Sequence, residues 1–391
     1  MHLVDSKVSQ ISLFGVCFSV KMDTNNLIGF IEKSTKPSSI FAKSLLRESI
    51  SSQLLHLFTS ISFLLYATTK IYKIHKSTKN THLGISISDL TYNKCIIIAN
   101  ILYTSSLVAT ILLYKYNAHI YVKYINDFQS SIKTPFGLAQ TSYVNKWQKI
   151  DRFIVRLQFL TRITVRAVEY YANPFNLTYS YTDIVVSFMC ELSLILEQQF
   201  IHETCIYLQS DFVYYHLFFD SLTKMVNESV GLDVYHAIKS VRHMHSQTIQ
   251  FSRKIDSFFR LTLLNTLGFL TIYSICNIGL ILAPNQTMMR VLTIIGKAIL
   301  FLAILSVSVY HFARVNYLSL QIFNKVYDLS LSPNLVRSIE TMNEINLFLF
   351  RIRRDDVGFT FAGLCVVSVN FISSLAIIAL TIGLALPGFF K

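Results

Sequence analysis

Long apolar stretches without a charged residue recur along the chain. A helix needs about 20 largely apolar residues to cross a bilayer, because every backbone polar group has to be paired within the segment. Each such stretch is therefore predicted to be a transmembrane helix. Five of them, one interrupted by a single lysine, cover 49–69, 95–114, 261–289, 291–313 and 357–390.

Two further candidate helices, at about 153–172 and 182–203, carry charges that an isolated membrane helix tolerates poorly. The first holds three arginines, Arg162 and Arg166 among them, each costing about 2.5–3.5 kcal/mol near a helix centre. Its nine Ile, Leu, Val and Phe residues return only roughly 0.5 kcal/mol each. The arginines must therefore face a bundle interior or a cavity, where Arg166 can pair with Glu169. We predict seven spans, with five spans and a basic surface helix as the alternative.

Outside the predicted spans, two apolar stripes keep a helical period. They predict one long helix that continues into the fifth span and another that begins at Ser332-Pro333. Neither stripe would face lipid, so the two helices should pack together beneath the membrane; the alternative is a surface that binds another protein. The first stripe is Val234, Ile238, Val241, His245, Thr248, Ser252, Ile255, Phe259 and Leu263, and the second is Leu335, Ile339, Met342, Ile345 or Asn346, Leu349 and Ile352.

These elements predict an all-α polytopic membrane protein. The order is a cytoplasmic segment at 1–48, helices one to four in 49–210, a cytoplasmic helical segment at 211–258, helices five and six in 259–314, another cytoplasmic helical segment at 315–356 and the seventh helix in 357–391. The apolar run Ile11–Val20 is too short to span and lacks a small-residue cleavage site, so an interfacial helix is expected rather than a signal peptide.

Composition adds an orientation. Charged residues make up only 15% of the 391 residues, and the net charge is +13. Of the 35 Lys and Arg residues, 24 lie in the four segments that share one side of the membrane with the N-terminus, namely the segment before the first span, 115–152, 207–260 and 312–356. The positive-inside rule then places the N-terminus in the cytoplasm and the C-terminus outside, which excludes an ordinary G-protein-coupled receptor. Glycosylation sites at Asn176 and Asn285 fall in predicted outer loops. The basic excess indicates an anionic membrane face, with lipid and not nucleic acid as the partner, and a multi-pass protein of the cell membrane.

Catalytic chemistry is not indicated. The sequence has no Gly-rich phosphate loop and no nucleophile beside a base, so neither an enzyme nor a cofactor is predicted. Six cysteines without a CxxC pair are expected to be buried free thiols. His243 and His245 lack a third ligand at a matching spacing, so a solvated helix face is preferred to a metal site.

The last apolar run carries a stripe of polar residues, Asn370, Ser373, Ser374 and Thr381. Shared between symmetric copies of the chain, such a stripe could line a water path that apolar residues farther along close by dewetting. The alternative is that the serines pack helices closely.

Two short patterns in this run are also informative. Thr381 and Phe389 stand eight residues apart with 383–387 between them, and upstream lie Phe359, Phe361, Ala362 and Gly363. On these residues the chain resembles the insect gustatory receptor family, seven-helix chemoreceptors whose N-terminus is inside. Their last helix ends with Thr-Tyr, five hydrophobic residues and Gln-Phe, after a Phe-x-Ala-x-Gly-like segment. Ile382 and Gly388 replace the family Tyr and Gln, so a gating role of that Gln does not carry over.

The resemblance implies a ligand-gated, non-selective cation channel, homo- or heterotetrameric, whose pore is formed by four copies of the last helix. The predicted pore and gate residues are Asn370, Ser374, Thr381, Leu386 and Phe389. Such receptors hold a small-molecule ligand, a tastant, in an outward-facing pocket.

Polar residues in the outer halves of spans three to six are the candidates for that pocket, because polar groups at that depth are costly unless they face a cavity. Salt bridges within the bundle are the alternative, and a small polar or amphipathic ligand would suit such a lining. The candidates are Arg166, Glu169, Tyr170, Asp183, Glu191, Tyr273, Asn277 and Lys297.

Two other functions remain open. A receptor-like accessory protein that has lost conduction would agree with the replaced Tyr and Gln. A secondary transporter would use the buried ionisable residues as a relay, but the two halves of the chain show no inverted repeat.

Overall fold

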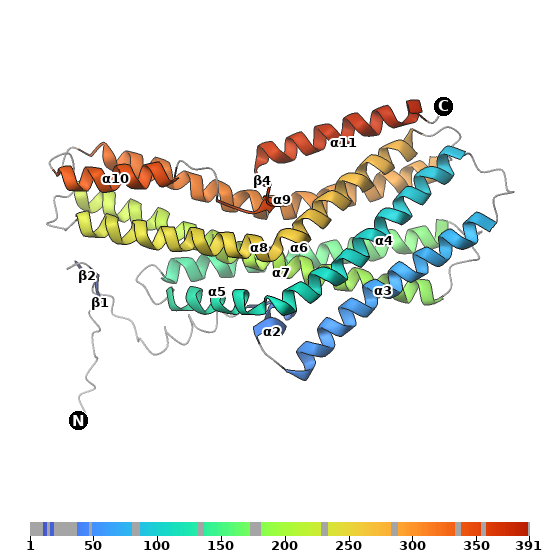
Figure 1. Cartoon of the computed structure of the whole chain (residues 1–391), viewed down its shortest axis with the longest axis horizontal. Helices are drawn as coiled ribbons and strands as arrows, with labels where there is room; N and C mark the ends of the chain where they lie inside the picture. The colour runs from blue at the N-terminus through green and yellow to red at the C-terminus, as the bar shows by residue number, and fades with distance from the viewer. Residues whose placement is uncertain are drawn as a thin grey trace, which may run out of the picture.

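The computed structural model describes residues 11–13, 16–18, 37–46, 49–79, 87–131, 137–172, 181–227, 234–282, 288–332, 338–352 and 357–389. These residues form an elongated bundle of helices (Figure 1). The helices are α2 (Ile40–Leu46), α3 (Ile50–Lys79), α4 (Ile87–Tyr116), α5 (Ala118–Ser131), α6 (Gly137–Ala172), α7 (Tyr181–Asn227), α8 (Val234–Ile281), α9 (Met288–Ser330), α10 (Ile339–Ile352) and α11 (Val369–Phe389). Two short hairpins join β1 (Ile11–Leu13) to β2 (Val16–Phe18) and β3 (Thr360–Phe361) to β4 (Cys365–Val366).

The helices α7, α8 and α9 are much longer than a bilayer requires. They contain 47, 48 and 43 residues, and at 1.5 Å per residue each extends about 65–70 Å, against a hydrocarbon core of about 30 Å. Each therefore has a half that crosses the membrane and a half that projects beyond it. We call the end that carries α10 the inner end, since the cation-rich segments predicted to be cytoplasmic meet there, and the opposite end, toward which α3 and α11 run, the outer end (Figure 1).

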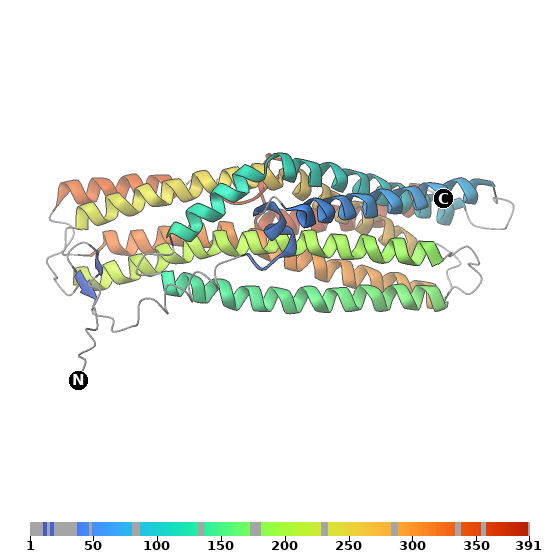
Figure 2. The same ribbon diagram turned by 90° about the horizontal axis from the view of Figure 1, so that it is seen from below.

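Five of the described helices, α3, α4, α7, α8 and α9, are long and apolar enough to cross a membrane. The charged helix α6 is not among them, yet it lies beside α7 along the bundle (Figure 2). The five apolar helices, α6 and the shorter apolar helix α11 together make seven, as predicted. The prediction that the arginines of α6 face inward holds for Arg162, which pairs with Glu191 of α7, and is wrong for Arg156, which is exposed; the Arg166 side chain lies outside the described residues.

The centre of the bundle is a cluster of aromatic rings. Phe200 of α7 contacts Tyr114 of α4, Phe258 of α8 and Phe41 of the short helix α2, with ring centroids 5.4–6.2 Å apart. The Glu203 carboxylate holds α2 in place by accepting the backbone N–H groups of Ser38 at 2.5 Å and Ser39 at 2.9 Å. It thereby satisfies donors at the start of a helix that have no partner within it.

Both predicted inner helices exist. The stripe on α8 is confirmed, with Ile238, Val241, Ile255 and Leu263 buried, and α8 continues into the fifth span without a break. As expected, α10 packs against α8, and Arg242 of α8 bonds to Glu344 of α10 at 2.7 Å.

The predicted face of α10 is only partly right. Ile345 and Ile352 are buried, but Ile339 is 80% exposed and Phe348, outside the predicted stripe, is fully buried. The helix begins at Ile339, and 333–337 are outside the described residues, so the predicted start at Ser332-Pro333 is not supported.

Three smaller expectations are corrected. The run expected as an interfacial helix contains the antiparallel hairpin β1–β2, which agrees with its β-branched and aromatic residues. His245 is buried against Phe212, Tyr215 and Phe348, so its helix face is not solvated there. Among the cysteines, Cys190, Cys205 and Cys276 are buried and free as expected, while Cys95 and Cys365 are exposed.

Candidate functional site

A cavity of about 120 Å³ lies among the membrane-crossing helices α3, α4, α6, α7, α8 and α9. Its lining combines aromatic and aliphatic side chains with a few polar ones, the usual character of a small-molecule site. The lining residues are Tyr66, Asn100, Tyr103, Thr104, Arg162, Val165, Cys190, Glu191, Leu194, Glu197, Gln198, Ile201, His202, Leu263, Thr266, Phe269, Tyr273, Leu300, Ile304, Ser308 and Phe312.

One wall of the cavity is aromatic. Tyr103 of α4 stacks on Phe269 of α8 with ring centroids 4.2 Å apart and ring planes 9° from parallel. Phe269 contacts Tyr273 one turn along the same helix at 5.7 Å. Such a wall offers a flat apolar face on which another ring can stack.

An ion pair crosses the cavity between α6 and α7. The Arg162 guanidinium lies 2.6 Å from the Glu191 carboxylate, and the two side chains are only 12% and 17% exposed. Arg162 Nε and the amide nitrogen of Gln198 are buried donors without a hydrogen-bond partner among the described residues. The cavity therefore presents unused donors to any ligand that carries an acceptor.

A second acid, Glu197, closes the cavity toward the bundle centre. It is 4% exposed and accepts long hydrogen bonds from Thr110 at 3.5 Å and Tyr114 at 3.4 Å. Tyr114 also bonds to Thr262 of α8, so a chain of polar contacts runs from the cavity acid to α8.

The structure brings together part of the predicted pocket. Glu191 and Tyr273 line the cavity, whereas Asn277 is buried one turn farther along α8 and donates to the Tyr273 carbonyl at 2.8 Å. Asp183 lies on α7 and is not in the lining. The side chains of Arg166, Glu169, Tyr170 and Lys297 are outside the described residues.

Several lining residues were missed by the sequence prediction. Arg162 is one of the arginines that had to face inward, and its partner is Glu191 rather than a residue on its own helix. Tyr103, Phe269 and Gln198 carry no charge, so nothing in their local sequence distinguishes them from other helix residues.

The second part of the candidate site is α11. The uncharged run predicted as the seventh span is helical only from Val369, because 360–366 form the hairpin β3–β4. Its turn holds Ala362 and Gly363 at positive φ, 55° and 77°, a conformation that glycine adopts without steric cost.

The helix α11 packs along α8 through small residues. Ala379 and Gly383 are buried on that face, and Gly383 sits so close to Ile278 that an added Cβ would lie 2.9 Å from it. The opposite face is open, with Ile377 64% exposed.

The predicted pore stripe lies on the open face. Asn370, Ser373, Ser374 and Thr381 are all exposed, and the three hydroxyls donate to carbonyls of their own helix at 2.8–3.0 Å. The serines therefore do not pack this helix against the described part of the chain. The side chains of Leu386 and Phe389 lie outside the described residues.

A clasp joins α8 to the hairpin that precedes α11. The Asp256 carboxylate accepts the backbone N–H of Thr360 at 2.6 Å and its hydroxyl at 2.7 Å. Burial raises the pKa of Asp256, and these hydrogen bonds oppose the rise. From α9, Asn316 donates to the Val357 carbonyl at 2.8 Å, while Phe359 is buried against Phe312. The segment that leads into α11 is thus fixed to α8 and α9, two of the helices that line the cavity.

Sites of other kinds are sparse. Asn176 and Asn285, the predicted glycosylation sites, are outside the described residues. Among the described residues, one group of side chains, Asp151, His202 and His311, brings metal-ligating atoms within 4.8 Å of one another. No sequence motif indicates this group, because Asp151 and His202 are 51 residues apart and His202 and His311 are 109 residues apart.

Comparison with known proteins adds a fold. No protein-family model matches the chain, and no curated protein matches it in sequence. The solved structures that are similar include the insect olfactory receptor OR5 from Machilis hrabei in complex with eugenol, at TM-score 0.63 and 11% identity, and the same receptor without that ligand, at 0.62 and 12%. In both comparisons 93% of this chain and 99% of the receptor are covered. The chain is accordingly an all-α, polytopic membrane protein with the seven-helix fold of an insect olfactory receptor.

Proposed function

We propose that the protein is a chemosensory, ligand-gated, non-selective cation channel of the cell membrane. The observation that carries this proposal is the double role of α8, which lines the cavity with Leu263, Thr266, Phe269 and Tyr273 and also bears α11 along its outer half. A ligand that shifts α8 would therefore shift the helix proposed to line the pore.

The cavity favours a small ligand with an aromatic ring and a polar group. The ring would stack in the Tyr103–Phe269 wall, and the polar group would accept from Gln198 or Arg162. Eugenol, bound by the similar olfactory receptor, has this chemistry and is a reasonable first probe. The half-kept C-terminal motif leads us to propose a gustatory receptor, and hence a tastant.

A tetramer would account for the open face of α11. In one chain the polar stripe is exposed and is not covered by any described part of the chain. Around a fourfold axis four stripes would line a common path, with Thr381 and then Leu386 and Phe389 toward the outer end. Homomers and heteromers with related receptors are both compatible with this arrangement. A monomeric state in mild detergent would contradict the proposal.

Substituted cysteines test the pore. Thr381→Cys should let a charged thiol reagent reduce the ligand-evoked current. The matched control is Ile382→Cys, which is also exposed but points about 100° away around the helix, on the side opposite to Ser373. Equal inhibition of both variants would show that α11 does not line the pore. Attachment of glycans at Asn176 and Asn285 would establish the proposed orientation separately.

An accessory protein without conduction is the second candidate, favoured by Ile382 and Gly388 in place of the family Tyr and Gln. It predicts an assembled, ligand-binding protein whose purified oligomer carries no cation flux in vesicles. Restoring the family Tyr and Gln with Ile382→Tyr and Gly388→Gln should then raise the cation flux.

A further inference from the structure

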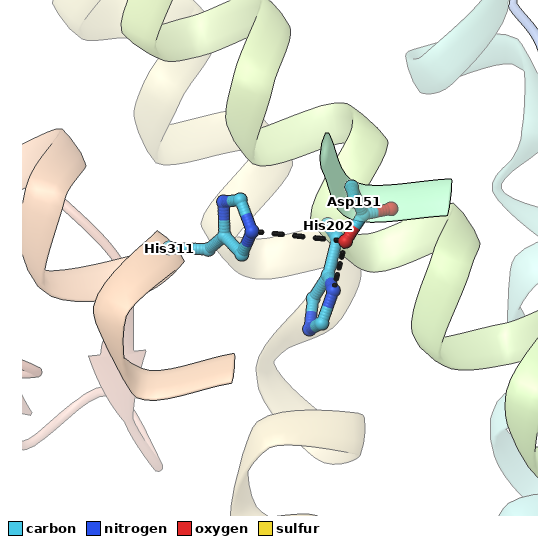
Figure 3. A group of neighbouring side chains, drawn as sticks. All are labelled: Asp151, His202 and His311. Atoms are coloured by element: carbon cyan, nitrogen blue, oxygen red, sulfur yellow. Dashed lines mark hydrogen bonds and ion pairs between the residues drawn. The ribbon is translucent and has the colours of Figure 1, made fainter. Parts of the chain in front are cut away.

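Three buried ionisable side chains from three different helices meet near the inner end of the membrane-crossing segments (Figure 3). Asp151 comes from α6, His202 from α7 and His311 from α9, and all three are at most 2% exposed. Both imidazoles point at the same carboxylate oxygen, Asp151 Oδ1: His202 Nδ1 is 2.7 Å from it and His311 Nε2 is 3.7 Å from it.

Hydrogen bonding leaves this group incomplete. A distance of 3.7 Å exceeds that of a hydrogen bond, so the Nε2 atom of His311 has none to Asp151. Its other ring nitrogen, Nδ1, is buried and has no hydrogen-bond partner among the described residues. Buried polar groups are nearly always paired, so a buried imidazole whose Nδ1 has no hydrogen-bond partner among the described residues, and whose Nε2 lies too far from Asp151 for one, leaves room for a partner of another kind.

We propose that Asp151, His202 and His311 form a binding site for a divalent transition-metal ion of the zinc type. Zinc takes imidazole nitrogens and carboxylate oxygens at about 2.0–2.2 Å in tetrahedral geometry, which places neighbouring ligand atoms roughly 3.3 Å apart. The observed separations of 2.7 and 3.7 Å lie on either side of that value. All three ligand atoms lie within 4.8 Å of one another, so movements of about 1 Å would bring them to an ion between them.

The surroundings support coordination by these atoms. Ser308 Oγ lies 3.0 Å from His202 Nε2, so it can accept the proton on that nitrogen and leave Nδ1 free to bind a metal. The two imidazole rings stack at 4.6 Å, and Trp147 meets the His311 ring at 6.4 Å. A donor set of two nitrogens and one oxygen suits zinc and neighbouring metals rather than magnesium or calcium, which require oxygen ligands. Three protein ligands also leave a fourth position for solvent or another group.

The site adjoins the cavity. His202 and Ser308 line the cavity on one side of the His202 ring, and the metal would lie on the other side. An ion held there would tie α6, α7 and α9 together beneath the ligand, so metal occupancy and ligand binding should influence each other. The metal site rests on its own geometry and does not depend on the proposed channel function.

Metal content is the direct test. The full-length protein, purified in detergent and dialysed against micromolar zinc chloride, should hold one zinc ion per chain by mass spectrometry. His311→Gln should weaken zinc binding at least tenfold. The control His245→Gln removes another buried imidazole without a hydrogen-bond partner, but one outside the group of three, so its zinc binding should be unchanged. Absence of stoichiometric zinc from the wild type, or equal binding by His311→Gln, would overturn the proposal.

A second measurement avoids the risk that a variant does not fold. The chain has a single tryptophan, Trp147, next to His311. Cobalt(II) bound at this site should quench its fluorescence in the wild type, and a chelator should restore it. The same cobalt should show visible absorption bands of tetrahedral coordination. Unchanged Trp147 fluorescence on cobalt addition would contradict the site even if zinc were found elsewhere on the protein.

Discussion

The contact between α8 and α11 depends on the missing side chain of Gly383. A Cβ built there would lie 2.9 Å from Ile278 Cβ and Cγ2 and 3.0 Å from its Cδ1. Carbon atoms normally approach to about 3.5–4.0 Å, and Ile278 Cβ cannot rotate away because it is attached to the backbone. We therefore expect Gly383→Ala to push the two helices apart.

Two opposing effects set the size of the change. Overpacking a close contact costs about 1–3 kcal/mol, whereas alanine in place of glycine inside a helix gains roughly 0.5–1 kcal/mol. Gly383→Ala should therefore lower the free energy of unfolding by up to about 2.5 kcal/mol. Gly268 on α8 provides the control, since a Cβ there meets nothing within 4 Å and Gly268→Ala should only stabilise.

The assay is thermal unfolding of the detergent-solubilised protein, followed by hydrogen exchange in α11. Gly383→Ala should lower the midpoint and speed exchange in α11, and Gly268→Ala should do neither. Adding Ile278→Ala makes room, so the double variant should recover at least about 1 kcal/mol relative to the sum of the single changes. Stabilisation by Gly383→Ala, or additive effects in the double variant, would show that the close approach of α8 and α11 is wrong.

Three other predictions concern the cavity, the clasp and the inner helices. Removing either charge of the Arg162–Glu191 pair should cost about 3–5 kcal/mol, and replacing both with Met and Leu should recover most of it in a thermal double-mutant cycle; losses that simply add in the double variant would contradict the pair. Thr360→Val should lose one hydrogen bond to Asp256 and lower the stability by about 1 kcal/mol. It should also raise the ligand concentration needed for half-maximal current. An unchanged dose response would show that the clasp takes no part in gating. Burial lowers the pKa of His245 from 6.5 to about 3, and the nearby Arg351 charge adds to this effect. Between those two pH values the unfolded chain binds a proton at His245 that the folded chain does not. Stability should fall with decreasing pH there by up to about 1.4 kcal/mol per pH unit, and His245→Leu should flatten the slope; parallel melting curves would refute this.

The order of the helices follows from the sequence because membrane insertion is governed by composition over about 20 residues. The long helix through α8 was predictable for a similar reason, since its stripe from Ile238 to Leu263 holds one face in register across the membrane boundary. Helix α6 was the hardest case, and the partner of its Arg162, Glu191, lies on the adjacent helix, which the sequence alone does not show.

What the sequence could not give are the contacts between distant segments. The hairpin at 360–366 is as apolar as the helix that follows it, and it bends because Asp256, about a hundred residues earlier, holds Thr360. The pocket was predicted from charge, so Glu191 was found, but the aromatic wall of Tyr103 and Phe269 was missed because rings are common throughout the chain. The group of Asp151, His202 and His311 exists only after three helices have packed.

The uninterrupted length of α7 and α8 has a mechanical consequence. Each helix reaches from the cavity to the inner end without a break, so each behaves as a lever rather than as two independent segments. A tilt of a fraction of a degree at the ligand displaces the far end in proportion to the distance, about 40 Å or more for such helices. Substitutions among the inner helices, far from any ligand, should therefore alter the sensitivity to the ligand by changing how strongly the packing at the inner end resists movement of α7 and α8.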